Sequence, residues 1–402
     1  MSQCPPCEVS TNDVGCHDGD AVVCYAPRDT CIDGSNMSST RTYIFAGGGT
    51  GGHLFPGVAV ARELQRTDPA ARLIFVGSDK DLERSLVSRL QFEHRSLPVE
   101  SLSAVTRRPI RFVLGNWRAW RVARRWIQEL QPAVVIGLGG YASAPIVWAA
   151  ARARIPVVLL EQNVIPGRTT RWLARSARLV CVSFAETTDA LPRGTRVAVT
   201  GNPLRAEIAD LHSTQRADSA PQELLVLGGS QGADSLNDAV ARAAELLRDE
   251  LSEWHIVHQS GTRQVASLRA NYDRLSLKAR VEPFFDNMAE RYRSASLVIS
   301  RAGATTLAEL TCCGLPMILL PYPHAADNHQ RANAMSLKEH GAAVVVEHRS
   351  NVEATAHELA AQLRLLLGDA DRRRAMSDAG CRLAAPDAAS IVARHIESLV
   401  SD

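Results

Sequence analysis

The chain has 402 residues, of which 46% are hydrophobic and 22% are charged. This length predicts two or three domains, and the composition is typical of a folded globular protein. The 45 basic and 43 acidic residues leave a formal net charge of +2. So small a net charge excludes a protein whose whole surface is devoted to nucleic-acid binding. It does not exclude a local basic patch.

The N-terminal segment holds five of the nine cysteines and shows no apolar periodicity. Cys4-Pro-Pro-Cys7 is followed by no second Cys-x-x-Cys, so the spacing does not predict a zinc site. We expect residues 1–40 to be a disordered, cysteine-containing extension: either translation starts at Met37 or the tail is dispensable. The segment has neither a basic start nor an apolar core, which predicts no secretory signal and a cytoplasmic protein.

An uncharged stretch of 19 residues, Ala133–Ala151, approaches the length of a membrane-spanning helix. The glycines and the proline in its middle predict a strand, a glycine-rich loop and a helix instead. The four remaining cysteines lie in apolar or helical contexts and are expected to be buried thiols. They are Cys181, Cys312, Cys313 and Cys381.

From Thr42 onward, short apolar runs alternate with amphipathic stretches, which predicts a parallel α/β architecture. The candidate strands are Tyr43–Ala46, Leu73–Gly77, Ala133–Gly137, Val157–Leu160, Leu179–Ser183, Val197–Thr200, Leu224–Gly228, His255–His258, Leu297–Ser300, Met317–Leu320 and Ala343–Val346. The polar stretch Ala209–Gln222 is interpreted as a linker. We therefore predict two Rossmann-like domains facing each other across a cleft, residues 41–205 and 206–385. Residues 386–402 are expected to form a helix that returns to the first domain.

Three glycine-rich loops follow candidate strands, at residues 47–52, 137–140 and 228–232. Glycines there let backbone amides approach an anion at a helix start. Gly47, Gly49 and Gly52 also satisfy G-x-G-x-x-G, a weak match that leaves a nucleotide-dependent oxidoreductase open. One dinucleotide does not require three such loops, so we predict two ligands that both carry diphosphates.

The segment Arg301–Glu309 carries the most specific nucleotide signal. Gly303 and Ala304 open a predicted helix directly after strand Leu297–Ser300, and its free amides can bind a diphosphate. Glu309 lies about two turns into this helix, where its carboxylate can accept both hydroxyls of a ribose. A solvated helix carboxylate is the alternative that the pattern leaves open.

These motifs resemble the MurG family, the peptidoglycan glycosyltransferases that act on lipid I. The segments that carry the resemblance follow one another from Thr42 to about residue 395: Ala46-GGGTGGHLFPGVAVA, Gly137-LGGYASAP, Glu161-Gln162-Asn163, Thr200-GNPLR, Leu227-GGSQGADSLN, His258-QSG, Arg301-AGATTLAE and Asp327-NHQRANA. The resemblance implies an inverting transferase of the GT-B fold, an α/β architecture.

The resemblance also implies the reaction: transfer of N-acetylglucosamine from UDP-GlcNAc to the 4-hydroxyl of the muramyl sugar of lipid I, which forms lipid II. A related GT-B transferase with another lipid acceptor is the alternative, and a non-catalytic UDP-sugar sensor is a further one. The implied partners are UDP-GlcNAc, lipid I, an anionic membrane surface at the cytoplasmic face of the inner membrane, and cell-wall synthesis enzymes. No cofactor and no nucleic acid are expected.

The resemblance implies site residues in three groups. His53 and Glu161 are the catalytic candidates: either could be the general base, and each could instead only orient a loop or a phosphate. The implied UDP-GlcNAc-binding residues are Thr50, Gly51, Gly52, Asn163, Arg205, Ser230, Phe285, Ala304, Thr305, Thr306, Leu307, Glu309 and Gln330. The implied ligands of the acceptor pyrophosphate are Gly49, Gly139, Gly140, Tyr141 and Ser143.

Two features bear on the chemistry. Leu160 stands where the family often has a histidine, so no role of that histidine is carried over. Asp79-Lys80-Asp81 and Asp369-Ala370-Asp371 have the Asp-x-Asp spacing of metal-dependent transferases, but neither follows a strand at the nucleotide site. Helix-cap or solvated roles are the interpretation, and we expect no essential metal.

The segment Arg107–Arg125 has seven arginines interleaved with apolar residues. At helical spacing Ile110, Val113, Leu114 and Trp117 fall on one face. Two interpretations are open: a stripe that faces the core beneath a solvated basic face, or a surface that docks on anionic lipid.

Overall fold

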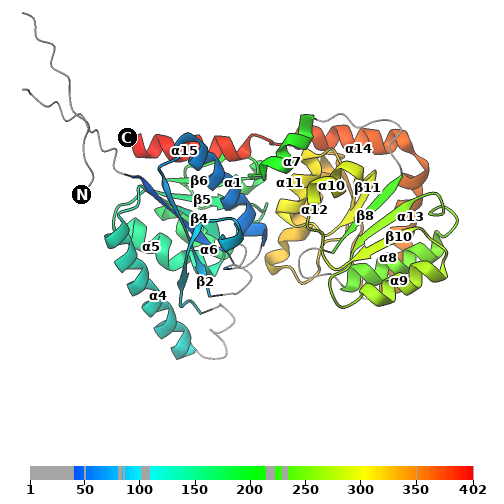
Figure 1. The fold of residues 1–402 in the computed structure, drawn as a ribbon, viewed down its shortest axis with the longest axis horizontal. Coiled ribbons are helices and arrows are strands. Elements are labelled where there is room, and N and C mark those ends of the chain that lie inside the picture. Colours follow the sequence, from blue (N-terminus) through cyan, green and yellow to red (C-terminus); the bar gives the residue numbers. More distant parts are fainter. Residues whose placement is uncertain are drawn as a thin grey trace, which may run out of the picture. The chain divides into compact units, whose positions relative to one another are not determined.

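The computed structural model describes residues 40–48, 51–79, 84, 87–100, 109–213, 222–228, 234–349 and 351–401. Residues 40–402 form one compact unit, which contains two parallel β-sheets flanked by helices (Figure 1). The N-terminal extension and its candidate start at Met37 lie outside the described residues.

The first sheet has seven strands in the order β3-β2-β1-β4-β5-β6-β7. They are β1 (Thr42–Gly47), β2 (Arg72–Ser78), β3 (Glu93–Leu97), β4 (Val134–Gly139), β5 (Val157–Glu161), β6 (Leu179–Val182) and β7 (Val197–Val199). The helices of this half are α1 (Gly51–Thr67), α4 (Pro109–Leu130), α5 (Ala144–Arg152) and α6 (Arg168–Leu173). All neighbouring strands run parallel.

The second sheet has six strands in the order β10-β9-β8-β11-β12-β13, again all parallel. They are β8 (Glu223–Leu227), β9 (His255–Gln259), β10 (Ala279–Glu282), β11 (Leu297–Ser300), β12 (Met317–Leu319) and β13 (Ala343–Val345). The helices from this part of the chain to its end are α7 (Ala206–Ala209), α8 (Asp234–Leu246), α9 (Val265–Arg274), α10 (Met288–Ser294), α11 (Ala304–Cys312), α12 (His329–Glu339), α13 (Val352–Gly368), α14 (Ala370–Leu383) and α15 (Ala388–Ser401).

Both sheets have the doubly wound strand order of a Rossmann fold. The chain begins each sheet in the middle, builds outward to one edge, and then returns to build the other side. The direction reverses between β1 and β4 in the first sheet and between β8 and β11 in the second. Doubly wound sheets bind ligands at the carboxyl ends of the strands at such switch points.

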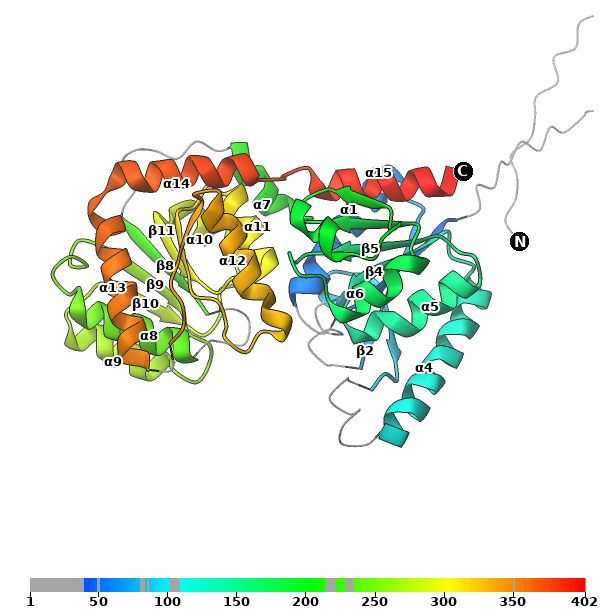
Figure 2. The same cartoon turned by 180° about the vertical axis from the view of Figure 1, so that it is seen from behind.

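Apolar residues of the strands fill two layers of core on each sheet, because both faces are covered by helices. In the first sheet, Tyr43 and Phe45 face a cluster with α1, while Ile44 and Ala46 face a cluster with α4 and α5. The last helix, α15, runs beside α1 (Figures 1 and 2). Its Val392 and Ile396 are fully buried in the cluster around Tyr43.

The predicted α/β class and two-sheet organisation are confirmed, but two strands were missed. β3 (EHRSL) and β10 (ARVE) are edge strands without the apolar runs of the inner strands. The start of the predicted linker is helical: Ala209 ends α7, and Leu211 is buried in the second domain's core. Residues 214–221 lie outside the described part of the chain.

The uncharged stretch Ala133–Ala151 forms β4, a 3₁₀ turn and α5, as its glycines predicted. No helix among the described residues is both long and apolar enough to cross a membrane. Of the four cysteines, Cys181 and Cys312 are buried as expected, whereas Cys313 is only half-buried. The expectation was wrong for Cys381, which is exposed in α14.

A buried polar network links β9, α8 and α9 in the second domain. His258 on β9 is fully buried, its Nδ1 accepts from the Tyr272 hydroxyl at 2.9 Å, and its Nε2 donates to Asn237 Oδ1 at 3.1 Å. Asn237 Nδ2 in turn donates to the Ser260 carbonyl oxygen at 2.9 Å. Burial lowers the pKa of His258 to about 3, since a charged imidazole would have to lose its water.

This shift predicts a loss of stability in acid. The folded pKa lies below the unfolded value of about 6.5, so the neutral imidazole stabilises the fold fully above that value. The contribution is lost as pH falls from about 6.5 towards 3, by up to ~1.4 kcal/mol per pH unit. Urea unfolding at several pH values should show this slope in the native protein and a shallower one in His258→Gln. The exposed His357→Gln is the control, and an equal slope in all three proteins would contradict the prediction.

Candidate active site

The first glycine loop connects β1 to α1 and packs directly on the second loop. Gly47 has φ +121°, and a Cβ there would lie 2.4 Å from the Gly139 carbonyl oxygen, so only glycine allows this approach. Gly139 and Gly140 also have positive φ, and Ser143 Oγ donates to the Gly140 carbonyl oxygen at 2.9 Å. The two loops follow β1 and β4, the strands that flank the first switch point. Gly49 and Thr50 lie outside the described residues.

His53 lies in the first turn of α1, against the second loop. Its Nδ1 is 3.0 Å from Gln162 Oε1, and Gln162 Nε2 donates to the Leu138 carbonyl oxygen at 3.4 Å. The second bond fixes which end of the amide faces the histidine. Because an amide oxygen only accepts, Nδ1 carries the hydrogen and Nε2 keeps its lone pair.

Glu161 ends β5 and is 4% exposed. Its Oε1 accepts from the backbone and side-chain nitrogens of Asn163 at 3.1 and 3.3 Å, and its Oε2 accepts from the Gly167 backbone nitrogen at 3.0 Å. Both oxygens therefore hold the loop that follows the strand. Of the two open interpretations, this geometry favours orientation of the loop. Leu160, one residue earlier, is buried in the core on the α1 side of the sheet.

Asn333 on α12 was not among the predicted residues, yet it joins the two halves of the site. It is fully buried. Its Oδ1 accepts from the Val164 backbone nitrogen at 2.9 Å, and its Nδ2 donates to Asn163 Oδ1 at 3.0 Å and to the Ala302 carbonyl oxygen at 3.2 Å. It lies in the segment Asp327-NHQRANA that carries the resemblance, but nothing in the sequence singled it out, because a buried asparagine in a helix shows its role only through its partners.

The start of α11 meets the start of α1. Thr305 Oγ1 donates to the Gly52 carbonyl oxygen at 2.8 Å. This carbonyl has no intrahelical donor, because Pro56 stands four residues later and has no N–H. Gly303 caps α11 without a side-chain hydrogen bond to the cap, and the helix start follows β11 at the second switch point. Ser230, in the loop after β8, lies outside the described residues.

Glu309 is buried in α11 and holds two partners, so the alternative of a solvated carboxylate is wrong. Tyr292 donates its hydroxyl hydrogen to Oε2 at 2.7 Å, and Arg205 Nη2 donates to Oε1 at 3.2 Å. Burial raises the pKa of Glu309, and the nearby Arg205 guanidinium opposes this rise. Burial and the Glu309 carboxylate raise the pKa of Tyr292 well above its usual value. Arg205 also lies over the Phe55 ring, 4.8 Å from its centroid.

The other predicted residues take different positions. Phe285 and Leu307 are core residues of the second domain, so only their backbones are available to a ligand. Gln330 Oε1 accepts from the Tyr322 backbone nitrogen at 2.9 Å. Ala304 is buried and Thr306 is half-buried in the first turn of α11, while Tyr141 is half-buried in the second loop.

The two Asp-x-Asp sequences make other contacts. Asp369 caps α14 by accepting from the Arg372 backbone nitrogen at 2.9 Å, and Asp79 pairs with Arg84. The helix-cap interpretation is confirmed for Asp369.

Two parallel doubly wound sheets, with glycine-rich sequences after the strands at their switch points, are the architecture of the GT-B fold. The profile of the glycosyltransferase family 28 N-terminal domain matches residues 43–182, and that of the family 28 C-terminal domain matches residues 223–392. Among solved structures, Acinetobacter baumannii MurG has a TM-score of 0.71 at 29% identity, over 89% of this chain and 99% of that one. The UDP complex of Staphylococcus aureus MnaA has a TM-score of 0.62 at 14% identity, over 90% of this chain and 98% of that one, a likeness of fold alone.

Two curated relatives share the name UDP-N-acetylglucosamine–N-acetylmuramyl-(pentapeptide) pyrophosphoryl-undecaprenol N-acetylglucosamine transferase. The one from Geobacter sulfurreducens is 38% identical over 87% of this chain and 96% of its own length. The one from Anaeromyxobacter dehalogenans is 40% identical over 89% of this chain and 92% of its own length. The chain belongs to this family of transferases, within glycosyltransferase family 28.

The contacts of Asn333 predict a measurable role in positioning Asn163. Asn333→Ala leaves the buried Val164 nitrogen without its acceptor, which should lower the free energy of unfolding by about 1–3 kcal/mol. It also removes one of the two partners of the Asn163 side chain, so KM for the sugar nucleotide should rise and kcat should fall. Urea unfolding and steady-state kinetics measure the two effects. Asn271→Ala, whose side chain bonds the Ala241 carbonyl oxygen away from the site, is the control. Unchanged kinetics in Asn333→Ala would contradict the role in positioning.

Proposed function

We propose that the protein transfers N-acetylglucosamine from UDP-GlcNAc to the 4-hydroxyl of the N-acetylmuramyl sugar of lipid I, and so forms lipid II for peptidoglycan synthesis. The observation that carries this proposal is the match to transferases of that name along nearly their whole length. The meeting of α1 and α11 supports it, because it joins the loops proposed for the acceptor to the helix proposed for the donor.

The reaction is an in-line displacement that inverts the anomeric carbon. The acceptor hydroxyl attacks C1 while UDP leaves, so the site needs a base for the hydroxyl and stabilisation for the leaving diphosphate. His53 Nε2 is the proposed base, since Gln162 holds the ring with its hydrogen on Nδ1. Glu161 is the alternative, but its oxygens already hold the loop at Asn163 and Gly167.

The donor is proposed to bind at the start of α11. Its free amides would receive the diphosphate together with Ser230, and Glu309 would accept the ribose hydroxyls. The Arg205 guanidinium lies 3.2 Å from the Glu309 carboxylate. We propose that this positive charge can turn towards a phosphate of the donor. Asn163 and Gln330 would contact the N-acetylglucosamine, and the Phe285 backbone the uracil. The acceptor pyrophosphate would lie at Gly49, Gly139, Gly140, Tyr141 and Ser143.

Transfer of labelled N-acetylglucosamine to a soluble-chain lipid I analogue tests this proposal. Transfer should proceed in EDTA, because Asp79 pairs with Arg84 and Asp369 caps α14. His53→Ala should lower kcat by a factor of about 10²–10⁴, the usual contribution of a general base, and should keep UDP-GlcNAc binding. His340→Ala, on the far end of α12, is the control. If UDP-GlcNAc binds but no sugar is transferred, the alternative of another lipid acceptor gains support.

We also propose that α4 docks the protein on an anionic membrane, as a peripheral protein at the cytoplasmic face of the inner membrane. The interpretation of a core-facing stripe is wrong for Val113, Leu114 and Trp117, which are 63%, 52% and 51% exposed. The helix instead buries Ala119, Ala123 and Ile127.

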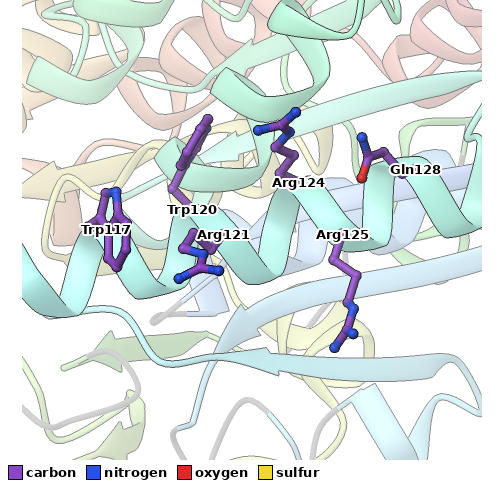
Figure 3. A pocket seen from close by; sticks show the side chains of 6 residues that line it. All are labelled: Trp117, Trp120, Arg121, Arg124, Arg125 and Gln128. Atoms are coloured by element: carbon purple, nitrogen blue, oxygen red, sulfur yellow. The ribbon is translucent and has the colours of Figure 1, made fainter.

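The exposed side of α4 combines aromatic rings with arginines. A hollow of about 380 Å³ on this helix is lined by Trp117, Trp120, Arg121, Arg124, Arg125 and Gln128 (Figure 3). Arg121 lies over the Trp117 ring at 4.9 Å. The row of rings continues from Trp120 to Trp148 at 5.2 Å and on to Trp172, which is 59% exposed. Tryptophan and arginine together suit the interface of an anionic bilayer.

Flotation with vesicles of phosphatidylglycerol or of phosphatidylcholine tests this surface. Arg121→Gln with Arg125→Gln should weaken binding to the anionic vesicles at least tenfold, since each basic residue near such a surface contributes about 1 kcal/mol. Added salt should weaken the native protein's binding in the same direction. The matched change Arg382→Gln, on the exposed side of α14, should have little effect. Vesicle binding that does not change with salt concentration, or that is equally strong in the double variant, would contradict the proposal.

A further inference from the structure

Arg301, directly after β11, is a buried guanidinium whose hydrogen-bond partners are all neutral. It is 8% exposed. Its Nη1 donates to the carbonyl oxygens of Leu320 at 2.9 Å and Pro321 at 3.5 Å, and its Nη2 donates to Ser235 Oγ at 2.7 Å. Within the described part of the chain, its Nε has no hydrogen-bond partner.

Among the residues that the structure describes, no ion pair compensates the positive charge of Arg301. The Tyr322 ring lies 5.7 Å from the guanidinium carbon. On another side, burial, Arg301 and His324 all lower the pKa of His348, so this neighbour is kept neutral. Burial lowers the pKa of Arg301 to about 10, and the side chain therefore remains protonated at neutral pH.

A buried cation without a carboxylate is costly to the fold, because the solvation lost on burial is not repaid. A purely structural role at this position could be filled by an uncharged side chain of similar length. Fixed positive charge in a dry environment is, by contrast, what stabilises charge that develops during a reaction.

The position of Arg301 in the fold connects both parts of the donor site. Ser235 is the second residue of α8, which follows the third glycine loop, and Arg301 stands two residues before Gly303, the cap of α11. These helices follow β8 and β11, the strands that flank the second switch point. The backbone nitrogen of Tyr322 donates to Gln330, the residue proposed to contact the transferred sugar.

We propose that Arg301 is a positioning residue that supplies fixed positive charge to the leaving diphosphate, through Ser235 and the starts of α8 and α11. This inference rests on the proposed function. In the transfer, the bond between C1 and the β-phosphate oxygen breaks, and its electron pair stays on that oxygen. The acceptor oxygen forms the new bond to C1, and its proton passes to the general base. UDP therefore leaves with one more negative charge than it carried as the sugar conjugate.

Calorimetric binding of uridine, UMP and UDP to the whole protein tests this role. Arg301→Met should weaken UDP binding by about tenfold or more, as expected for loss of a charge-assisted interaction. UMP should lose less, and uridine, which has no phosphate, should lose less than about twofold. Arg301→Lys should recover part of the UDP affinity. In the transfer assay kcat should fall in Arg301→Met while KM for the acceptor is kept.

Equal loss for uridine and UDP would overturn the inference, because it would indicate a structural role. Unchanged UDP binding with unchanged kcat would overturn it as well. Arg364→Gln, which removes an exposed arginine paired with Glu250, is the matched control for lost charge. If Arg301→Met does not fold, Ser235→Ala is the deciding variant, because it removes the hydrogen bond between Arg301 and Ser235 and leaves the buried charge in place. A selective loss of UDP affinity in this variant supports the inference. Unchanged UDP affinity overturns it. A native protein that binds UDP no better than uridine would instead refute the proposed donor site.

Discussion

The reversal of direction in each parallel sheet is the constraint on which the rest of the structure depends. Between β1 and β4, and between β8 and β11, successive helices pass to opposite faces, so the strand ends between them are left uncovered. The loops at these points must be short and must approach each other closely, which is why Gly47 lies against Gly139. His53 and the start of α11 follow strands at these switch points, whereas Glu161 and Asn163 lie at the end of the neighbouring strand β5.

The polar groups of the site are held by buried partners rather than by water. Glu161 holds the loop of Asn163, Asn333 holds the same loop from the other domain, and Tyr292 holds Glu309. Such networks are stable only when every member is satisfied. Arg301 differs from these groups, because the hydrogen bonds of its buried guanidinium go to neutral oxygens alone.

The sequence was informative wherever a residue's role is local. Apolar runs located the inner strands, and glycines located the loops, since both depend on a few neighbouring residues. The edge strands β3 and β10 were missed because an edge strand needs no continuous apolar run. The exposure of Trp117, the burial of Glu309 and the contacts of Asn333 depend on what packs against each residue from distant parts of the chain. Spacing along a helix gives the face on which a side chain lies, but not whether that face is covered.

The proline in α1 has a consequence for how the two domains can part and meet. In a regular helix, a carbonyl that turned towards another domain would have to share or give up its own helical bond. Pro56 removes that competition, so when Thr305 withdraws from the Gly52 carbonyl a water molecule can take its place. When Thr305 leaves, the Gly52 carbonyl exchanges its hydrogen bond from Thr305 for one of similar strength from water. Breaking and re-forming this contact therefore need not strain the helix.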